Sequence, residues 1–129
     1  MIGRRILIVE DEYLLAEDLR RYLVLAGAVV VGPAPRLGRA QALIADEAQI
    51  DAAVLDVNLA GEPVFPVAEA LAVRDVPFVF VSGFDRSTLP PSLSERPLLQ
   101  KPVDFETLRQ VLTDLLRERQ EAGPRGETR

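Results

Sequence analysis

The sequence predicts a single α/β domain built on a doubly wound sheet of five parallel strands. Short apolar runs, too brief for helices, alternate along the chain with segments whose apolar residues recur at helical spacing. The apolar runs lack internal polar residues, which is typical of strands that helices cover on both faces. A length of 129 residues, of which 48% are hydrophobic, suits one domain with one substantial core.

Polar or charged residues stand at the end of four of the five predicted strands. The strands are predicted at residues 5–9, 29–32, 53–56, 76–81 and 98–100. The second strand is the exception, because Pro33-Ala34-Pro35 follows it and proline cannot donate a ladder hydrogen bond. We therefore expect the second strand to end at Gly32.

Four helices are predicted from the spacing of apolar residues and from their end signals. They are expected at residues 12–26, 37–48, from Pro63 or Pro66 to Val73, and from an Asp104 cap to about residue 119. The segment from Phe84 to Pro97 is the least regular, since three prolines limit any helix there to a turn or two. The predicted domain spans residues 1–119, and residues 120–129 have too few apolar residues to fold and are expected to be a disordered tail.

Composition excludes several classes of chemistry. The chain has no cysteine and no histidine, which rules out disulfides, thiolate nucleophiles and imidazole bases. A net charge of −5 argues against nucleic-acid binding, because neutralising phosphates needs clustered basic residues. No run of about 18 apolar residues is present to cross a bilayer, and Glu10-Asp11-Glu12 follows the first strand too closely for a signal peptide. We expect a cytoplasmic protein.

The polar residues that end the strands are expected to meet at one edge of the sheet. The ligands of doubly wound sheets bind outside the carboxyl ends of the strands. Glu10 and Asp11 follow the first strand, Asp56 ends the third, Ser82 follows the fourth and Lys101 follows the fifth. Each alone reads as an ordinary loop residue, but five at one edge predict a functional site.

The chemistry of this set is specific. Three clustered carboxylates repel one another unless a divalent cation lies between them or some of them take up protons. Oxygen ligands with positions left for water and a phosphoryl group are typical of Mg²⁺. The Lys101 ammonium and the Ser82 hydroxyl then suit the remaining phosphoryl oxygens, and Asp56 is left as the carboxylate for in-line attack.

The set Glu10-Asp11, Asp56, Ser82 and Lys101-Pro102, in this order and spacing, resembles the receiver domain of bacterial two-component response regulators. The resemblance covers residue 4 to about residue 119. It implies the flavodoxin-like strand order 2-1-3-4-5. The fourth helix of that fold, between the fourth and fifth strands, is expected to be shortened or irregular here. It also implies a signalling protein rather than an enzyme.

The resemblance implies a role for each site residue. Asp56 is similar to the phosphoacceptor, and Asp11, Asp56 and the backbone carbonyl of Asn58 are similar to the Mg²⁺ site, with Glu10 assisting through water. The implied phosphate donor is a phosphohistidine on a sensor histidine kinase or a histidine phosphotransfer protein. The downstream protein partner is not identified by the sequence, and a monomer or weak dimer is expected.

The resemblance also implies roles for the hydroxyl and the lysine. Ser82 is similar to the hydroxyl that turns toward the phosphoryl group, and Lys101 to its charge partner, which precedes a cis Pro102. The output is expected to be a protein contact at the surface of the fourth strand, the fifth strand and the last helix, either as phosphorylation-dependent binding or as a relay or sink for phosphoryl groups.

Two positions depart from the common receiver pattern. Glu10 replaces the commoner Asp, a longer side chain that is expected to keep a water-mediated role. Leu98 stands where many receivers carry the Tyr or Phe that swings inward. The run Phe80-Val81-Ser82-Gly83-Phe84 resembles a subgroup of stand-alone receivers, typical of alphaproteobacteria, that has a Phe-Ala-Thr-Gly-aromatic signature and lacks this aromatic. In that subgroup the segment from Phe84 to Pro97 would be the moving surface.

Three alternatives remain from other classes. A phosphatase of the haloacid dehalogenase kind also forms an aspartyl phosphate, but it needs an Asp-x-Asp pair on its first strand, and position 58 here is Asn. A flavin or nucleotide binder needs a Gly- or Ser/Thr-rich loop after the first strand, where this chain has three acids. A receiver-fold module for interaction or dimerisation, independent of phosphate, is the remaining alternative.

Overall fold

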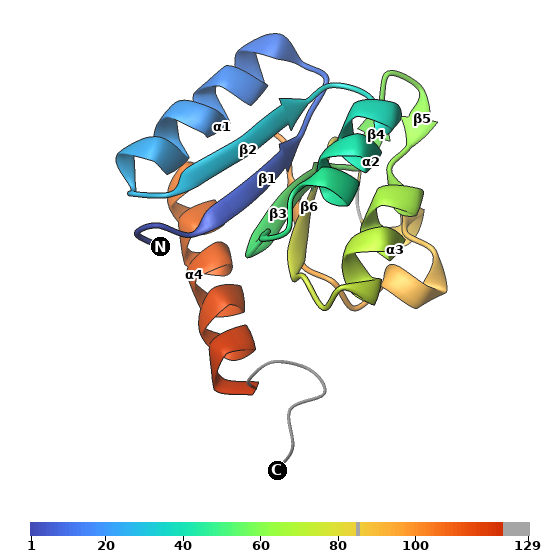
Figure 1. Ribbon diagram of the computed structural model, residues 1–129. Coiled ribbons are helices and arrows are strands. Elements are labelled where there is room, and N and C mark those ends of the chain that lie inside the picture. The colour runs from blue at the N-terminus through green and yellow to red at the C-terminus, as the bar shows by residue number, and fades with distance from the viewer. Residues whose placement is uncertain (85, 123–129) are drawn as a thin grey trace.

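A computed structural model of the chain describes residues 1–84 and 86–122. The elements are β1 (Arg5–Val9), α1 (Tyr13–Leu25), β2 (Val29–Ala34), α2 (Leu37–Asp46), β3 (Ala52–Asp56), β4 (Asn58–Leu59), β5 (Glu62–Pro63), α3 (Phe65–Val73), β6 (Phe78–Ser82), the 3₁₀ turns η1 (Arg86–Thr88) and η2 (Pro91–Leu93), β7 (Leu98–Gln100) and α4 (Phe105–Ala122). Figure 1 shows their arrangement around a central sheet.

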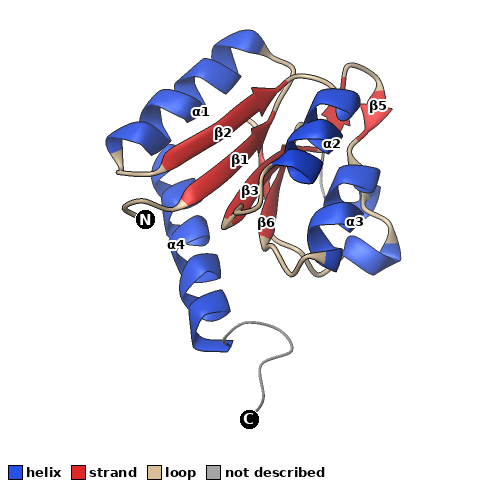
Figure 2. Cartoon of the chain, viewed as in Figure 1, coloured by secondary structure: helices blue, strands red, loops and turns tan. Residues whose placement is uncertain are grey.

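The central sheet is parallel and has the order β2-β1-β3-β6-β7. This order confirms the predicted 2-1-3-4-5 arrangement, with β6 and β7 as the predicted fourth and fifth strands. Figure 2 shows helices on both sides of the strands, as the doubly wound prediction requires.

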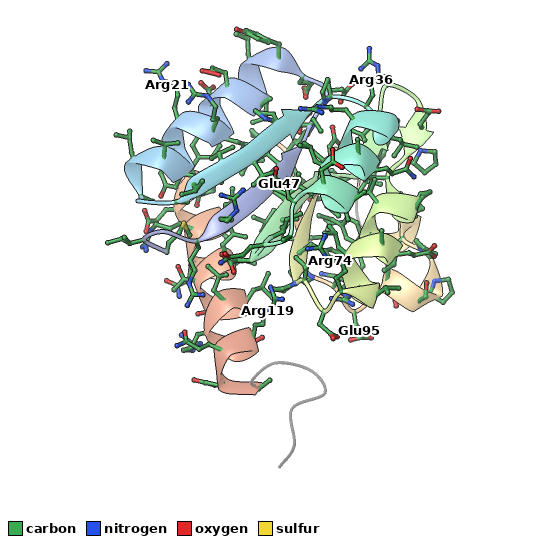
Figure 3. The ribbon with its side chains drawn as sticks, viewed as in Figure 1. Arg21, Arg36, Glu47, Arg74, Glu95 and Arg119 are labelled. Atoms are coloured by element: carbon green, nitrogen blue, oxygen red, sulfur yellow. The ribbon has the colours of Figure 1, made fainter. Side chains whose placement is uncertain are left out.

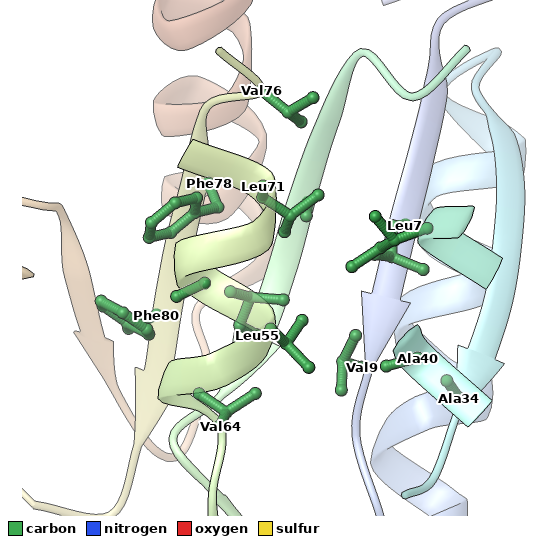
Figure 4. Close-up of a cluster of buried hydrophobic side chains, with 14 of the residues drawn as sticks. Leu7, Val9, Ala34, Ala40, Leu55, Val64, Leu71, Val76, Phe78 and Phe80 are labelled. Carbon is green, nitrogen blue, oxygen red and sulfur yellow. The ribbon is translucent and has the colours of Figure 1, made fainter. Parts of the chain in front are cut away.

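Alternate residues of each strand pack into two separate cores. In β1, Ile6 and Ile8 join the core beneath α1 and α4, while Leu7 and Val9 join the core beneath α2 and α3. Figure 4 shows the second core, where Leu55 and Phe80 meet side chains from α3. Because both faces of the strands are covered, the apolar runs in the sequence carry no polar residues.

Arg74, just after α3, joins α2 to α3. Its guanidinium donates to the backbone carbonyls of Ile44, Glu47 and Ala48 at the end of α2 (Figure 3). Ile44 lies in the last turn of α2, and Glu47 and Ala48 follow the helix end, where carbonyls lack intrahelical donors. The arginine therefore satisfies the end of α2.

The predicted end of the second strand was wrong. β2 continues through Pro33 to Ala34, and its register with β1 shifts between Leu7 and Val9. Proline is tolerated because β2 is an edge strand and because the irregularity leaves a place without a ladder bond. Gly32 has a φ of +92°, and a Cβ there would lie 2.9 Å from the Ala34 nitrogen, so the bulge requires glycine.

Other boundaries differ by a few residues. The α3 helix has Pro66 in its first turn, which decides between the two prolines considered. A small hairpin of β4 and β5 fills the turn that was expected after Asp56. The last helix continues to Ala122, past the predicted boundary at residue 119, and the rest of the predicted tail lies outside the described residues.

The segment between β6 and β7, where the resemblance places the fourth helix of a receiver, is irregular as predicted. The segment between β6 and β7 contains the turns η1 and η2, and Leu89 and Leu93 anchor it in the core beneath α3. Asp104 accepts hydrogen bonds from the Glu106 backbone nitrogen and the Thr107 hydroxyl, which confirms it as the cap of α4. Within the described residues, none of the helices has the length and hydrophobicity of a membrane span.

Candidate phosphoacceptor site

The carboxyl ends of four neighbouring strands bring the predicted site residues to one edge of the sheet. Glu10 and Asp11 follow β1, Asp56 ends β3, Ser82 ends β6 and Lys101 follows β7. Parallel pairing of these strands fixes their ends at a common level. The predicted convergence of the five residues is therefore present in the fold.

The three carboxylates form one cluster. Oxygen atoms of Glu10, Asp11 and Asp56 lie within 4.8 Å of one another. Glu10 and Asp56 are buried, whereas Asp11 is partly exposed. Among the described residues this is the one group of three or more acids with the spacing of a metal site.

Backbone amides hold each carboxylate in place. The Glu12 nitrogen donates to Glu10 Oε2 at 3.0 Å, and the Asn58 nitrogen donates to Asp56 Oδ1 at 3.1 Å. The Ala60 nitrogen, in the β4–β5 turn, donates to Asp11 Oδ2 at 3.1 Å. These donors fix the side chains before any ligand binds.

Lys101 supplies the positive charge of the site. Its ammonium lies 3.2 Å from Asp56 Oδ2, 3.4 Å from Glu10 Oε2 and 2.8 Å from Glu12 Oε1. The peptide bond between Lys101 and Pro102 is cis, as the resemblance implied. The Lys101 backbone nitrogen donates to the Ser82 carbonyl at 2.8 Å, which ties the lysine to the end of β6.

Ser82 is at the predicted edge but is bonded to its own loop. Its side-chain oxygen accepts a hydrogen bond from the Phe84 backbone nitrogen at 2.9 Å. The residue is buried at the end of β6, where its neighbour Val81 pairs with Asp56 across the ladder. Ser82 thus lies at the same edge of the sheet as the carboxylates, and its side-chain oxygen is engaged as an acceptor.

Burial dominates the electrostatics of the acids. Burial raises the pKa of Glu10 to about 8, and the neighbouring Asp56 carboxylate adds to the rise. Burial also raises the pKa of Asp56, although the Asn58 amide and the Lys101 ammonium favour its charged form. For Lys101 burial alone would lower the pKa, but the bond to Glu12 and the surrounding carboxylates raise it. The cluster has more negative charge than one ammonium balances.

One buried oxygen lacks a donor. Glu10 Oε1 is inaccessible to solvent and receives no hydrogen bond from the described residues. A buried carboxylate oxygen in this state is costly unless a proton or a cation satisfies it. The oxygen-only donor set and the excess negative charge fit a hard divalent cation such as Mg²⁺.

Two neighbours complete the description of the site. Leu98 is half-buried against the core beneath α3, paired in register with Phe80, so an aliphatic side chain fills the position where the resemblance would place an aromatic.

Glu12, which contacts the Lys101 ammonium, was missed as a site residue in the sequence. It is the third acid in a row after β1, but the spacing of acids in a sequence does not show which one reaches a distant lysine.

Comparison with known proteins gives the family. No family model and no curated protein matches the sequence. Among solved structures, the chain is similar to SdrG from Sphingomonas melonis Fr1, at 43% identity over 88% of this chain and 97% of that one, with a TM-score of 0.76. It is also similar to a response regulator receiver protein from Sinorhizobium medicae WSM419, at 26% identity over 89% and 95% of the two chains, with a TM-score of 0.76.

A third similar structure is the REC domain of the PhyR response regulator from Erythrobacter litoralis. It shares 26% identity over 100% of this chain and 98% of that one, with a TM-score of 0.79. The chain belongs to the receiver domains of response regulators. Its sheet order and helix placement are those of the flavodoxin-like receiver fold. A response regulator role follows for this receiver domain.

Proposed function

We propose that this receiver domain accepts a phosphoryl group on Asp56. The observation that carries the proposal is the position of this carboxylate, buried at the end of β3 with one oxygen 3.2 Å from the Lys101 ammonium and within 4.8 Å of the Glu10 and Asp11 oxygens. A nucleophilic carboxylate between a cation and further acids is the arrangement that aspartyl-phosphate chemistry requires.

The proposed step is an in-line displacement at phosphorus. An Asp56 carboxylate oxygen forms the new bond to phosphorus while the bond from phosphorus to the leaving group of the donor breaks. The electron pair of the broken bond departs with the leaving group, which is acetate for acetyl phosphate and the imidazole nitrogen for a phosphohistidine. The carboxylate attacks as an anion, so no base has to remove a proton from it.

The donor set of the site fits Mg²⁺. We propose that the carboxylates of Asp11 and Asp56 and the backbone carbonyl of Asn58 would hold the ion, with Glu10 acting through water. Support comes from the donorless Glu10 Oε1 and from the oxygen-only cluster. When bound, the ion offsets negative charge on the acids and on the incoming phosphoryl group.

Lys101 and Ser82 are proposed to stabilise the product. The Lys101 ammonium is beside Asp56 and offsets the charge of a phosphoryl oxygen. Ser82 has a hydroxyl hydrogen that its bond from Phe84 leaves free to donate, since its oxygen acts there as an acceptor. Rotation about the side-chain bond would turn this donor toward the phosphoryl group.

The proposed donor is a phosphohistidine on a sensor histidine kinase or a phosphotransfer protein, because the chain itself has no histidine. We propose that the protein acts as a bacterial cytoplasmic signalling component rather than as an enzyme, and that its output is a protein contact at β6, β7 and α4. The irregular segment after Phe84 and the aliphatic Leu98 support its assignment to the subgroup with the Phe-Ala-Thr-Gly-aromatic signature.

Intact-protein mass spectrometry after incubation with acetyl phosphate tests this function. We expect one phosphoryl adduct on the wild type that requires Mg²⁺ and disappears in Asp56→Asn. The matched control is Asp18→Asn. Asp18 is an exposed residue of α1 outside the carboxylate cluster, so this variant loses the same charge and should be phosphorylated like the wild type.

The outcome against the proposal is the absence of an adduct with acetyl phosphate and also with a phosphorylated histidine kinase as donor. That result would favour the phosphate-independent interaction module. An adduct that persists in Asp56→Asn would instead place the phosphoryl group on another residue.

A further inference from the structure

Glu12 makes the shortest of the three contacts to the Lys101 ammonium. Its Oε1 lies 2.8 Å from Lys101 Nζ, compared with 3.2 Å for Asp56 and 3.4 Å for Glu10. An ammonium has three N–H donors. With three carboxylates around it, every donor of Lys101 has a partner.

The position of Glu12 in the fold makes this contact unusual. Glu12 is the residue that precedes α1, in extended conformation, where a side chain ordinarily caps the helix by accepting from a backbone N–H. Its side chain makes no capping bond. It crosses instead to a lysine 89 residues away in the sequence.

We propose that Glu12 is a positioning residue that holds Lys101 at the solvent side of the site and so restrains phosphorylation of Asp56. This inference rests on the proposed function of Asp56. Glu12 is more than half exposed, at 54%, whereas the side chains of Glu10 and Asp56 are 1% and 6% exposed. Glu12 is therefore the solvent-exposed partner of the ammonium, and Glu10 and Asp56 are its buried partners.

A phosphoryl group on Asp56 brings new anionic oxygens that need a donor from Lys101. One of the three existing partners has to give up its N–H. Glu12 is the partner that can exchange its hydrogen bond with Lys101 for hydrogen bonds with water, since its carboxylate is exposed. Breaking this pair is thus part of the cost of phosphorylation, and an exposed ion pair of this kind changes an equilibrium or rate by up to about fivefold.

The sole lysine of the chain makes the contact directly measurable. Lys101 is the only lysine in the sequence, so lysine labelled with ¹⁵N at Nζ gives the ammonium signal of this residue alone. In metal-free protein, Glu12→Gln should speed the exchange of the ammonium hydrogens with water by about twofold or more, because the charge that holds them is gone. Asp18→Asn removes one charge from the same helix and should leave the exchange unchanged. An unchanged exchange rate in Glu12→Gln would overturn the proposal.

Phosphorylation rates test the consequence. With acetyl phosphate at saturating Mg²⁺, Glu12→Gln should be phosphorylated up to about fivefold faster than the wild type and Asp18→Asn at the wild-type rate. The advantage of Glu12→Gln should shrink as salt rises, since salt screens an exposed pair. Glu12→Asp separates contact from charge: it keeps the charge but is one methylene shorter, so it should also be faster. A wild-type rate in Glu12→Asp or in Glu12→Gln would overturn the proposal.

Phosphoryl-adduct formation and ammonium hydrogen exchange test the roles of Asp56 and Glu12 separately. If the wild type forms no phosphoryl adduct, the proposed function of Asp56 is wrong, while the ammonium exchange still decides whether Glu12 holds Lys101. If the wild type is phosphorylated and Glu12→Gln changes neither the exchange nor the rate, Asp56 keeps its role and the role of Glu12 is refuted.

Discussion

At the scale of single residues, Glu10 and Asp56 show what burial does to neighbouring carboxylates. Both are removed from water, and Lys101 contacts both with one charge. Two ionised acids whose oxygens lie within 4.8 Å of each other are unfavourable in a medium of low dielectric constant. Burial and the neighbouring Asp56 carboxylate raise the pKa of Glu10 to about 8, which favours one proton on this pair in the metal-free protein at neutral pH.

This proton makes the stability of the metal-free protein depend on pH. Between the ordinary Glu10 pKa of 4.5 and the folded value of about 8, the folded protein holds a proton that the unfolded chain has released. The free energy of unfolding therefore falls as pH rises through this range. We expect urea unfolding midpoints of EDTA-treated wild type to fall as the pH rises from about 5 to about 8 and to level off above that value.

Glu10→Gln supplies the control for the pH dependence. Glutamine keeps the shape of the side chain and does not titrate, so the difference between the two proteins isolates Glu10. We expect the midpoint of this variant to fall less steeply over the same range. Parallel pH profiles for wild type and variant would show that the proton is not held at Glu10.

At the scale of elements, the strands were predictable and their connections were only partly so. A strand buried on both faces, such as β3, leaves an uninterrupted apolar run in the sequence. The hairpin of β4 and β5 has two residues in each strand and no such pattern, because the fold around Asp56 creates it. The end of β2 was predicted from the proline rule, which holds for central strands but not for a bulged edge.

The same limit applies to the site. Asp56 and Lys101 could be predicted because each follows a recognisable strand. The role of Glu12 depends on the reach of a side chain across 89 residues, which no local spacing contains. The backbone donors to the acids, such as the Ala60 nitrogen, depend on the unpredicted hairpin.

The segment between β6 and β7 gives a prediction at this scale. Arg86 donates to the backbone carbonyls of Ser94 and Arg96, which closes the segment that carries η1 and η2. Arg86→Ala removes these bonds and should speed hydrogen exchange at the bonded amides of Leu89, Leu93 and Arg96. Each lost bond is worth about 1 kcal/mol, so an increase of about fivefold or more is expected.

Arg36→Ala is the control for this segment. Arg36 is an exposed arginine before α2, and its guanidinium donates to the carbonyl of the adjacent Pro35 (Figure 3). Its removal should leave the three amides unchanged. Equal exchange in Arg86→Ala and the wild type would mean that the buried Leu89 and Leu93, rather than the arginine, hold the segment.

At the scale of the whole molecule, the site is assembled only by the complete fold. Glu10 and Asp11 come from the start of the chain, Asp56 from its middle and Lys101 from near its end. The strands that carry them lie side by side in the sheet order β1-β3-β6-β7. An unfolded chain holds these acids far apart, so a ligand that needs them together binds the folded state alone and adds its binding free energy to folding.

Mg²⁺ should therefore stabilise the entire domain. At about 100 times its dissociation constant, an ion that binds only the folded state raises the free energy of unfolding by about 2.7 kcal/mol. We expect urea unfolding at pH 7 to show this increase for the wild type when Mg²⁺ replaces NaCl at equal ionic strength. Asp11→Asn should lose most of the increase, because it removes a partly exposed acid from the cluster while leaving the two cores intact. Asp18→Asn should retain it, and an equal response of all three proteins would mean that Mg²⁺ acts on the overall charge of −5 rather than at this site.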